Sequence, residues 1–190
     1  MRKIILASQS PRRKELLSEI VSEYTIIPSF ADETVPETVD TEDIVLYLAL
    51  LKARDIAQSH KEDIVIGADT VVIVDEKVLN KPKDEDDAKR MLKLLSGRCH
   101  KVCTGCAFVC GEIEHSFSVE TQVEFFELTD EEIDSYIKTG DCMDKAGAYG
   151  IQSQGKTLVK AIYGDYYNVV GLPVGRVKRE LYDFVSGLEK

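Results

Sequence analysis

The start of the chain limits the fold most strongly, because a strand pattern there passes directly into a helix start. Residues 4–7 are an uninterrupted apolar run, and residues 8–13 read Ser-Gln-Ser-Pro-Arg-Arg. Ser10 is a residue type that caps helices, and Pro11 suits the first helical position, where its missing N–H costs nothing. We therefore expect a buried strand followed at once by a helix, the unit from which α/β proteins are built.

The same segment is a candidate anion site. Arg12 and Arg13 fall in the first turn of the expected helix. The backbone N–H groups of that turn, the positive end of the helix dipole and the two guanidinium groups then face one spot. A phosphorylated ligand is the simplest occupant, and the alternative is a surface helix whose arginines are only solvated.

The rest of the chain alternates strand and helix patterns. Residues 63–74 read as a strand pair or as one long interrupted strand, and Gly67 marks a bend or a close backbone approach. Residues 100–110 and 113–127 read as two long strands joined at Gly111, a hairpin pattern. Further strands are expected at residues 3–7, 24–28, 157–162 and 166–170, and helices at 11–22, after a Thr41 cap, after Asp84, from a capping box at Thr129 and Glu132, and from Pro173. Strands separated by helices, with one hairpin, predict an α/β fold with a mixed β-sheet in a single domain covering residues 1–190.

Charge and hydropathy argue against two kinds of partner. The formal net charge is −10, and nucleic-acid binding requires basic surfaces, so we expect no nucleic-acid partner. A local basic pocket for an anionic small molecule is compatible with that charge. The longest apolar stretch, residues 44–51, falls far short of the ~18 residues that span a bilayer, and the N-terminal apolar run is too short for a secretory signal. We expect no membrane partner and a cytoplasmic protein.

Five cysteines in a chain without a secretory pattern favour reduced thiols. The spacing of Cys99, Cys103 and Cys106 matches the triplet that holds an iron–sulfur cluster in radical enzymes that use S-adenosylmethionine, and Cys110 adds a fourth sulfur. The surrounding residues read as a strand, in which neighbours point to opposite faces and rise ~3.3 Å each. Cys99 and Cys110 would then lie tens of ångströms apart, so we expect buried small side chains and no metal cluster.

Asp69 is the central candidate for chemistry. It lies in an otherwise apolar strand pattern, residues 65–70, and a buried carboxylate is costly unless it is paired with cations or a metal. The alternative is an aspartate that caps a turn. Glu33, in an acidic loop whose carboxylates could simply be solvated, is the second candidate, and the two carboxylates together suit a divalent ion. Lys52 and Lys81 are the matching cations, although a helix lysine such as Lys52 is more often an exposed salt-bridge partner.

Six segments in the same order resemble the Maf family, the nucleoside triphosphate pyrophosphatases once described as septum formation inhibitors. The resemblance covers essentially the whole chain, and it implies an elongated sheet that separates two lobes around a nucleotide-binding cleft. The matching segments are residues 8–13, 67–72, 81–82, 96–100, 144–152 and 164–173.

The resemblance also implies roles for individual residues. Asp69 matches the position described as the proton acceptor, and Arg12, Thr70 and Gln152 match the specificity positions. The residue types themselves, and not the resemblance, suggest that Glu33 and Asp69 hold a divalent cation, Mg²⁺ with Mn²⁺ or Co²⁺ as substitutes, and Asp69 stays open as base, metal ligand or both. The triphosphate of a nucleoside triphosphate substrate would be bound by Ser8, Arg12, Arg13, Lys52 and Lys81.

Residues 67–70 and 144–150 look like the branch of the family that hydrolyses dTTP and UTP to the monophosphate and pyrophosphate. Gln152 suits that substrate, because an amide offers a donor and an acceptor to the edge of uracil or thymine. One departure is Ser153, where the family commonly has glycine, and a positive φ there would strain a serine. The chain lacks the Gly-x4-Gly-Lys-Ser/Thr loop expected of many kinases. The alternative function is a non-catalytic nucleotide sensor that regulates cell division, and a homodimer stays open.

Overall fold

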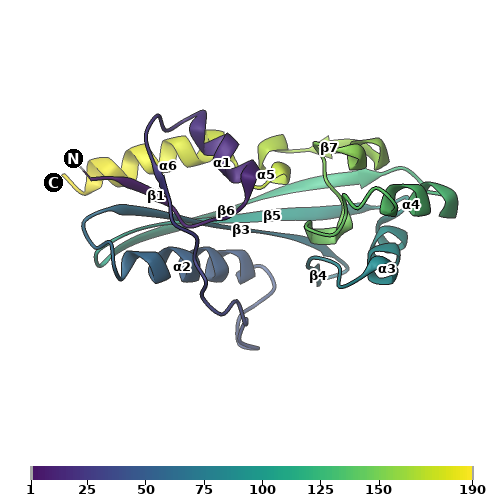
Figure 1. Cartoon of the computed structure of the whole chain (residues 1–190), viewed down its shortest axis with the longest axis horizontal. Helices are drawn as coiled ribbons and strands as arrows, with labels where there is room; N and C mark the ends of the chain where they lie inside the picture. Colours follow the sequence, from purple (N-terminus) through teal and green to yellow (C-terminus); the bar gives the residue numbers. More distant parts are fainter. Residues whose placement is uncertain (1, 190) are drawn as a thin grey trace. The chain divides into compact units, whose positions relative to one another are not determined.

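The computed structural model describes residues 2–189 and contains a seven-stranded mixed β-sheet with helices packed on it (Figure 1). The strand order is β2-β1-β3-β5-β6-β7, and β4 pairs with β3. β1 runs parallel to both β2 and β3, whereas the β3–β4 and β6–β7 pairs are antiparallel. The strands are β1 (Ile4–Leu6), β2 (Thr25–Ile26), β3 (Ile64–Val74), β4 (Lys77–Leu79), β5 (Cys99–Cys110), β6 (Ile113–Phe125) and β7 (Val159–Tyr163). The predicted α/β class with a mixed sheet is confirmed.

Six α-helices and two short 3₁₀ helices are present among residues 2–189. They are α1 (Pro11–Ser18), α2 (Ile44–Ala57), α3 (Glu85–Leu95), α4 (Asp130–Ile137), η1 (Ala146–Ala148), η2 (Gln154–Leu158), α5 (Tyr166–Val170) and α6 (Val174–Gly187). Asp84 caps α3 through a bond from the Asp87 N–H, and Thr129 and Glu132 form the expected capping box of α4.

The chain divides into two compact units. The first comprises the described residues up to Asp69, Thr104–Val119 and the described residues from Gly171. The second comprises Thr70–Cys103 and Glu120–Val170. Three of the four boundaries between the units fall inside the long strands β3, β5 and β6. Each unit is therefore built from segments that are distant in the sequence.

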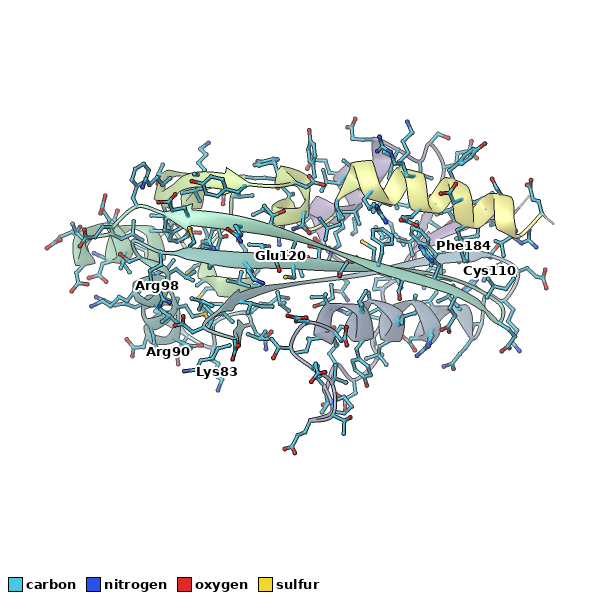
Figure 2. The ribbon with its side chains drawn as sticks, turned by 180° about the vertical axis from the view of Figure 1, so that it is seen from behind. Lys83, Arg90, Arg98, Cys110, Glu120 and Phe184 are labelled. Carbon is cyan, nitrogen blue, oxygen red and sulfur yellow. The ribbon has the colours of Figure 1, made fainter. Side chains whose placement is uncertain are left out.

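In the first unit, α2 lies against the sheet with almost no side chain between the two backbones. Alanines 49, 53 and 57 of α2 belong to the same buried core as residues of β1, β3 and β5. A Cβ atom on Gly67 of β3 would lie 2.1 Å from the carbonyl oxygen of Ala49, and one on Gly105 of β5 would lie 2.2 Å from that of Val45. The expected close approach at Gly67 is therefore confirmed. Elsewhere in this unit Phe184 of α6, labelled in Figure 2, packs on Phe108 of β5 with ring centroids 5.6 Å apart.

The second unit has a separate core. Met91, Leu92 and Leu95 of α3 are buried in it together with residues of β5, β6 and α4. Its centre holds His100 of β5, whose ring makes edge-on contacts with Phe125 and Tyr149. Because α3 and α4 present their apolar faces to this core, their charged faces lie at the surface.

One predicted element is wrong in type. Residues 166–170 form the helix α5 rather than a strand. The Asp165 carboxylate accepts a bond from the Tyr167 N–H at the start of this turn, and the buried Asn168 donates to Val102 O and Thr121 Oγ1. The two Asn168 contacts join residues far apart in the sequence, so the local aromatic and β-branched pattern, which is typical of strands, did not predict this helix.

Other differences concern boundaries. α2 begins at Ile44, because residues 40–43 close a turn in which the Asp43 N–H donates to Asp40 O, so Thr41 does not cap the helix. α1 ends at Ser18 instead of residue 22, and β2 is limited to Thr25–Ile26. Residues 64–74 form one uninterrupted strand, and the 111–112 turn joins β5 to its neighbour β6 as predicted. None of the helices within residues 2–189 has the length and apolarity required to cross a membrane.

Candidate active site

Asp69, Lys52 and Glu33 form an ion cluster in the first unit. The Lys52 Nζ donates to Asp69 Oδ1 at 2.6 Å and lies 3.0 Å from Glu33 Oε2. The side chains of Lys52 and Asp69 are only 12% and 13% exposed, whereas that of Glu33 is 54% exposed. Asp69 therefore lies within a strand as the carboxylate of a shielded ion pair, and the interpretation of it as a turn cap is wrong.

The fold brings Lys52 to Asp69 through Gly67. Residues two apart on a strand share a face, so Gly67 and Asp69 both face α2. The missing side chain of Gly67 lets the Ala49–Ala53 turn of α2 sit directly on β3, and Lys52 belongs to that turn. The 2.6 Å contact between Lys52 and Asp69 consequently depends on how closely the helix and strand backbones approach.

The start of α1 has the predicted geometry. Ser10 is the N-cap, its Oγ accepts from the Arg13 N–H at 3.4 Å, and Pro11 occupies the first helical position. The Arg13 Nε donates to the Gly171 carbonyl at 2.9 Å, and its Nη1 donates to the Oγ of the buried Ser8 at 3.4 Å. The guanidinium is thus held in a fixed orientation at the helix start.

Arg13 belongs to the same charged cluster as Asp69. Burial lowers the pKa of Arg13, and the nearby carboxylates of Asp69 and Glu33 oppose that shift. The neighbouring Arg12 charge acts in the same direction as burial. Because arginine stays protonated in proteins, Arg13 adds a permanent positive charge beside Asp69. The structure therefore brings together Ser8, Arg12, Arg13, Glu33, Lys52 and Asp69 in one unit.

The other predicted site residues belong to the second unit. Thr70 follows Asp69 in β3 and is half-buried, whereas Lys81 and Gln152 are exposed. The segment before Lys81 is tied to the Gly147 loop, because the Gly147 N–H donates to Asn80 O at 3.1 Å. Two parts of the family resemblance, residues 81–82 and 144–152, are therefore adjacent within this unit.

Ser153 does not have the strained backbone that a glycine replacement would suggest. Its φ is −101°, a value open to any residue. The left-handed positions of this loop are instead Gly147 and Ala148, with φ values of 68° and 61°. A Cβ at Gly147 would also lie 2.8 Å from the Val72 side chain, so glycine is required there for two reasons.

Sequence reasoning missed three contributors. Gly105 allows the backbone of α2 to pack directly on β5. A glycine inside a strand pattern often marks such a close approach, so the sequence does contain this indication. The Gly171 carbonyl that holds Arg13 had no local signal, because the two residues are 158 positions apart. The Tyr136–Asp141 hydrogen bond of 2.8 Å joins residues only five apart, but no motif of the sequence marks it.

The carboxylates of Glu33 and Asp69 could bind a divalent cation that is also held by substrate phosphates. Both approach the same Lys52 nitrogen, so their oxygens are close together. Among residues 2–189 they are not joined by a third acidic, histidine or cysteine side chain. Mg²⁺ in phosphoryl-transfer sites is commonly held by one or two carboxylates with the substrate phosphates. The residues therefore fit a metal that arrives with a phosphorylated substrate.

The cysteines have a different environment. No disulfide links the five cysteines, all of which lie within the described residues 2–189, and Cys106, Cys110 and Cys142 are buried. Burial raises the pKa of Cys106 to about 12. Since a thiolate is the metal ligand, Cys106 is a neutral core side chain at physiological pH.

Comparison with known proteins shows the family and the fold of this chain. The profile described as Maf-like protein matches residues 3–184. The chain is 51% identical over 187 residues to a protein of Bacillus cytotoxicus named dTTP/UTP pyrophosphatase, covering 98% of each chain, and 50% identical over 186 residues to one of the same name from Bacillus mycoides, covering 98% and 97%. A solved HAM1 protein from Coxiella burnetii has the same fold, with a TM-score of 0.57 and 16% identity over 96% of this chain and 100% of that one. Since the profile and these relatives span nearly the whole chain, the protein belongs to the Maf family.

Proposed function

We propose that this protein is a cytoplasmic nucleoside triphosphate pyrophosphatase that hydrolyses dTTP and UTP to the monophosphate and pyrophosphate. The observation that carries the proposal is the shielded Asp69 carboxylate, held by Lys52 beside the Arg13 helix start. This arrangement supports a role for Asp69 as a proton acceptor, because fixed positive charges surround its carboxylate. The relatives named dTTP/UTP pyrophosphatase at 50–51% identity support the choice of substrate.

The positive groups would bind the triphosphate. The N–H groups at the start of α1 and the guanidinium of Arg13 already share one location. Such fixed donors stabilise the charge that develops on departing pyrophosphate without reorganising during the reaction. The proposed phosphate-binding residues are Ser8, Arg12, Arg13, Lys52 and Lys81.

Asp69 would act as the general base. A carboxylate accepts at both oxygens, so Asp69 can hold Lys52 at Oδ1 and take a proton from water at Oδ2. The water oxygen then forms a bond to the α-phosphorus, while the bond between the α-phosphorus and the bridging oxygen breaks. Pyrophosphate leaves with that electron pair, and Asp69 returns its proton to solvent.

Glu33 and Asp69 would hold the divalent cation, Mg²⁺ or its substitutes Mn²⁺ and Co²⁺, together with substrate phosphates. When bound, the ion supplies positive charge that stabilises the phosphate oxygens in the transition state. The Lys52 ammonium group contacts both carboxylates and so holds them close together without a metal ion.

Gln152, with Thr70 and Arg12, would select the base. The Gln152 amide is exposed on its loop and offers one donor and one acceptor edge. Cytosine has the size of uracil but reverses donor and acceptor at one edge. A buried polar group left unpaired costs about 1–3 kcal/mol, so CTP should be a poorer substrate than UTP by about five- to 150-fold.

The test is product analysis. Purified protein with Mg²⁺ is incubated separately with dTTP, UTP, CTP, ATP and GTP, and the products are separated, with Asp69→Asn as control. Monophosphate and pyrophosphate from dTTP and UTP, lost in the variant, are the expected result. Nucleotide binding without turnover would favour the alternative, a nucleotide-sensing regulator of cell division. Diphosphate and phosphate would show that another bond is cleaved and overturn the proposal.

A further inference from the structure

We propose that Tyr136 and Ser153 are positioning residues that fix the backbone of Gln152 from both sides, and that base selectivity depends on them. This inference rests on the proposed function, since it concerns how the base-reading loop is held. Tyr136 belongs to α4, and Ser153 follows Gln152 directly.

A single carboxylate links the two residues. The Tyr136 hydroxyl accepts from the Gly150 N–H at 3.1 Å and donates to Asp141 Oδ2 at 2.8 Å. The Ser153 hydroxyl donates to the same Asp141 oxygen and lies 3.2 Å from the Gly150 carbonyl. The loop is therefore anchored two residues before Gln152 and one residue after it.

The Asp141 carboxylate that links Tyr136 and Ser153 carries a negative charge and is paired with Lys145. Lys145 donates to Asp141 Oδ1 at 3.0 Å and to the Asp141 carbonyl at 2.6 Å. Burial acts to raise the pKa of Asp141, but hydrogen bonds from Ser153, Lys145 and Tyr136 outweigh it and hold that pKa below its usual range. Asp141 is thus an ionised acceptor at neutral pH, and hydrogen bonds to a charged group are stronger than neutral ones.

Packing restricts the same loop. Ile151 is 8% exposed and anchors the residue before Gln152 in the interior. A Cβ on Gly155 would lie 2.7 Å from the Gly150 carbonyl and 2.9 Å from the Tyr136 hydroxyl, so the returning chain lies directly on this anchor. Gln152 itself is exposed. Its amide is therefore carried on a restrained backbone, and such preorganisation reduces the entropy lost when a ligand is bound.

The hydrogen bond from Ser153 to Asp141 gives this serine a role that glycine could not fill. A glycine at this position would lack the hydroxyl that reaches Asp141 and would leave the backbone freer. We therefore infer that this chain uses Ser153 to hold the residue that discriminates uracil from cytosine. A purely structural role would change stability but leave that discrimination intact, so the two roles are separable.

The test compares Ser153→Ala and Tyr136→Phe with Thr157→Val in the full-length protein. Thr157 is a matched control, because its hydroxyl donates to the nearby Gln154 carbonyl at 2.9 Å and not to Asp141. The ratio of kcat/KM for UTP to that for CTP should fall about two- to tenfold in each of the two variants, the scale of one hydrogen bond. kcat for UTP should change less than KM. The control should keep the wild-type ratio, and Ser153→Thr, which retains the hydroxyl, should recover most of it.

A second measurement does not depend on turnover. Amide hydrogen exchange at residues 150–153 should accelerate in Ser153→Ala and Tyr136→Phe relative to Thr157→Val. Unchanged exchange would overturn the anchoring, and faster exchange with an unchanged UTP-to-CTP ratio would overturn its link to selectivity. If the wild-type protein hydrolyses no nucleotide, the proposed function fails by itself, and the ratio of dissociation constants for UTP and CTP replaces the kinetic ratio in the same comparison.

Discussion

Replacing Gly67 by alanine should reduce activity by separating Lys52 from Asp69. The new Cβ would lie 2.1 Å from the Ala49 carbonyl oxygen and 2.9 Å from the Ala53 N atom, whereas an ordinary contact begins at 3.4 Å. Because both are backbone atoms of α2, the helix must move away from β3 by about 1.3 Å, the difference between 3.4 Å and 2.1 Å. Such overpacking typically costs about 1–3 kcal/mol in free energy of unfolding.

The displacement acts directly on the 2.6 Å contact between Lys52 and Asp69, since those residues lie on the two backbones that separate. A misplacement of ~1 Å can reduce catalysis about 100-fold. We therefore expect kcat/KM for dTTP, measured by pyrophosphate release, to fall by about that factor in protein that still unfolds cooperatively in urea.

Gly175→Ala is the matched control. Gly175 lies in α6, and a Cβ there would have Arg179 Nη1 as its nearest neighbour, at 3.7 Å. Alanine is the better helix former by about 0.5–1 kcal/mol, so stability should hold or rise and activity should stay unchanged. Wild-type kinetics in Gly67→Ala would refute the reasoning, and a loss of stability without a loss of activity would refute its link to the ion cluster.

Three further predictions follow from the same structure. Asp69→Asn should keep the fold and lose ~100-fold or more in kcat, the lower range for a general base, because an amide is a poor proton acceptor; retention of most of the wild-type kcat would make Asp69 structural. Excess chelator should abolish pyrophosphate release, and added Mg²⁺ should restore it, because Glu33 and Asp69 are suited to an ion shared with the substrate; full activity in chelator would exclude the ion. Burial lowers the pKa of His100 from 6.5 to about 4, so the unfolded chain binds the proton more readily, and the free energy of unfolding should decrease as pH falls from 6.5 to 4, by up to about 3 kcal/mol. Urea unfolding at several pH values should show this slope reduced in His100→Gln, and an unchanged slope would contradict it.

Features that depend on neighbouring residues are predictable from the order of the amino acids alone. Ser10 and Pro11 start α1, and Thr129 with Glu132 starts α4, because capping involves backbone groups within three positions of the capping residue. The hairpin at Gly111 is equally local, since that residue has a φ of 59° in the turn. The family resemblance added candidate roles for Asp69, and those roles await the experiments above.

Contacts between distant groups depend on the folded chain. Nothing in the spacing of Glu33 and Lys52 predicts that their charges lie 3.0 Å apart, since Glu33 lies in the loop after β2 and Lys52 lies in α2. The helix at 166–170 was likewise decided by Asn168, whose side chain bonds to segments more than 40 residues away. Local hydrogen bonds are specified by the order of neighbouring residues, whereas long-range contacts depend on strand register and on how closely glycine lets two backbones approach. The charged cluster around Asp69 consists of such long-range contacts, and the sequence alone therefore did not predict it.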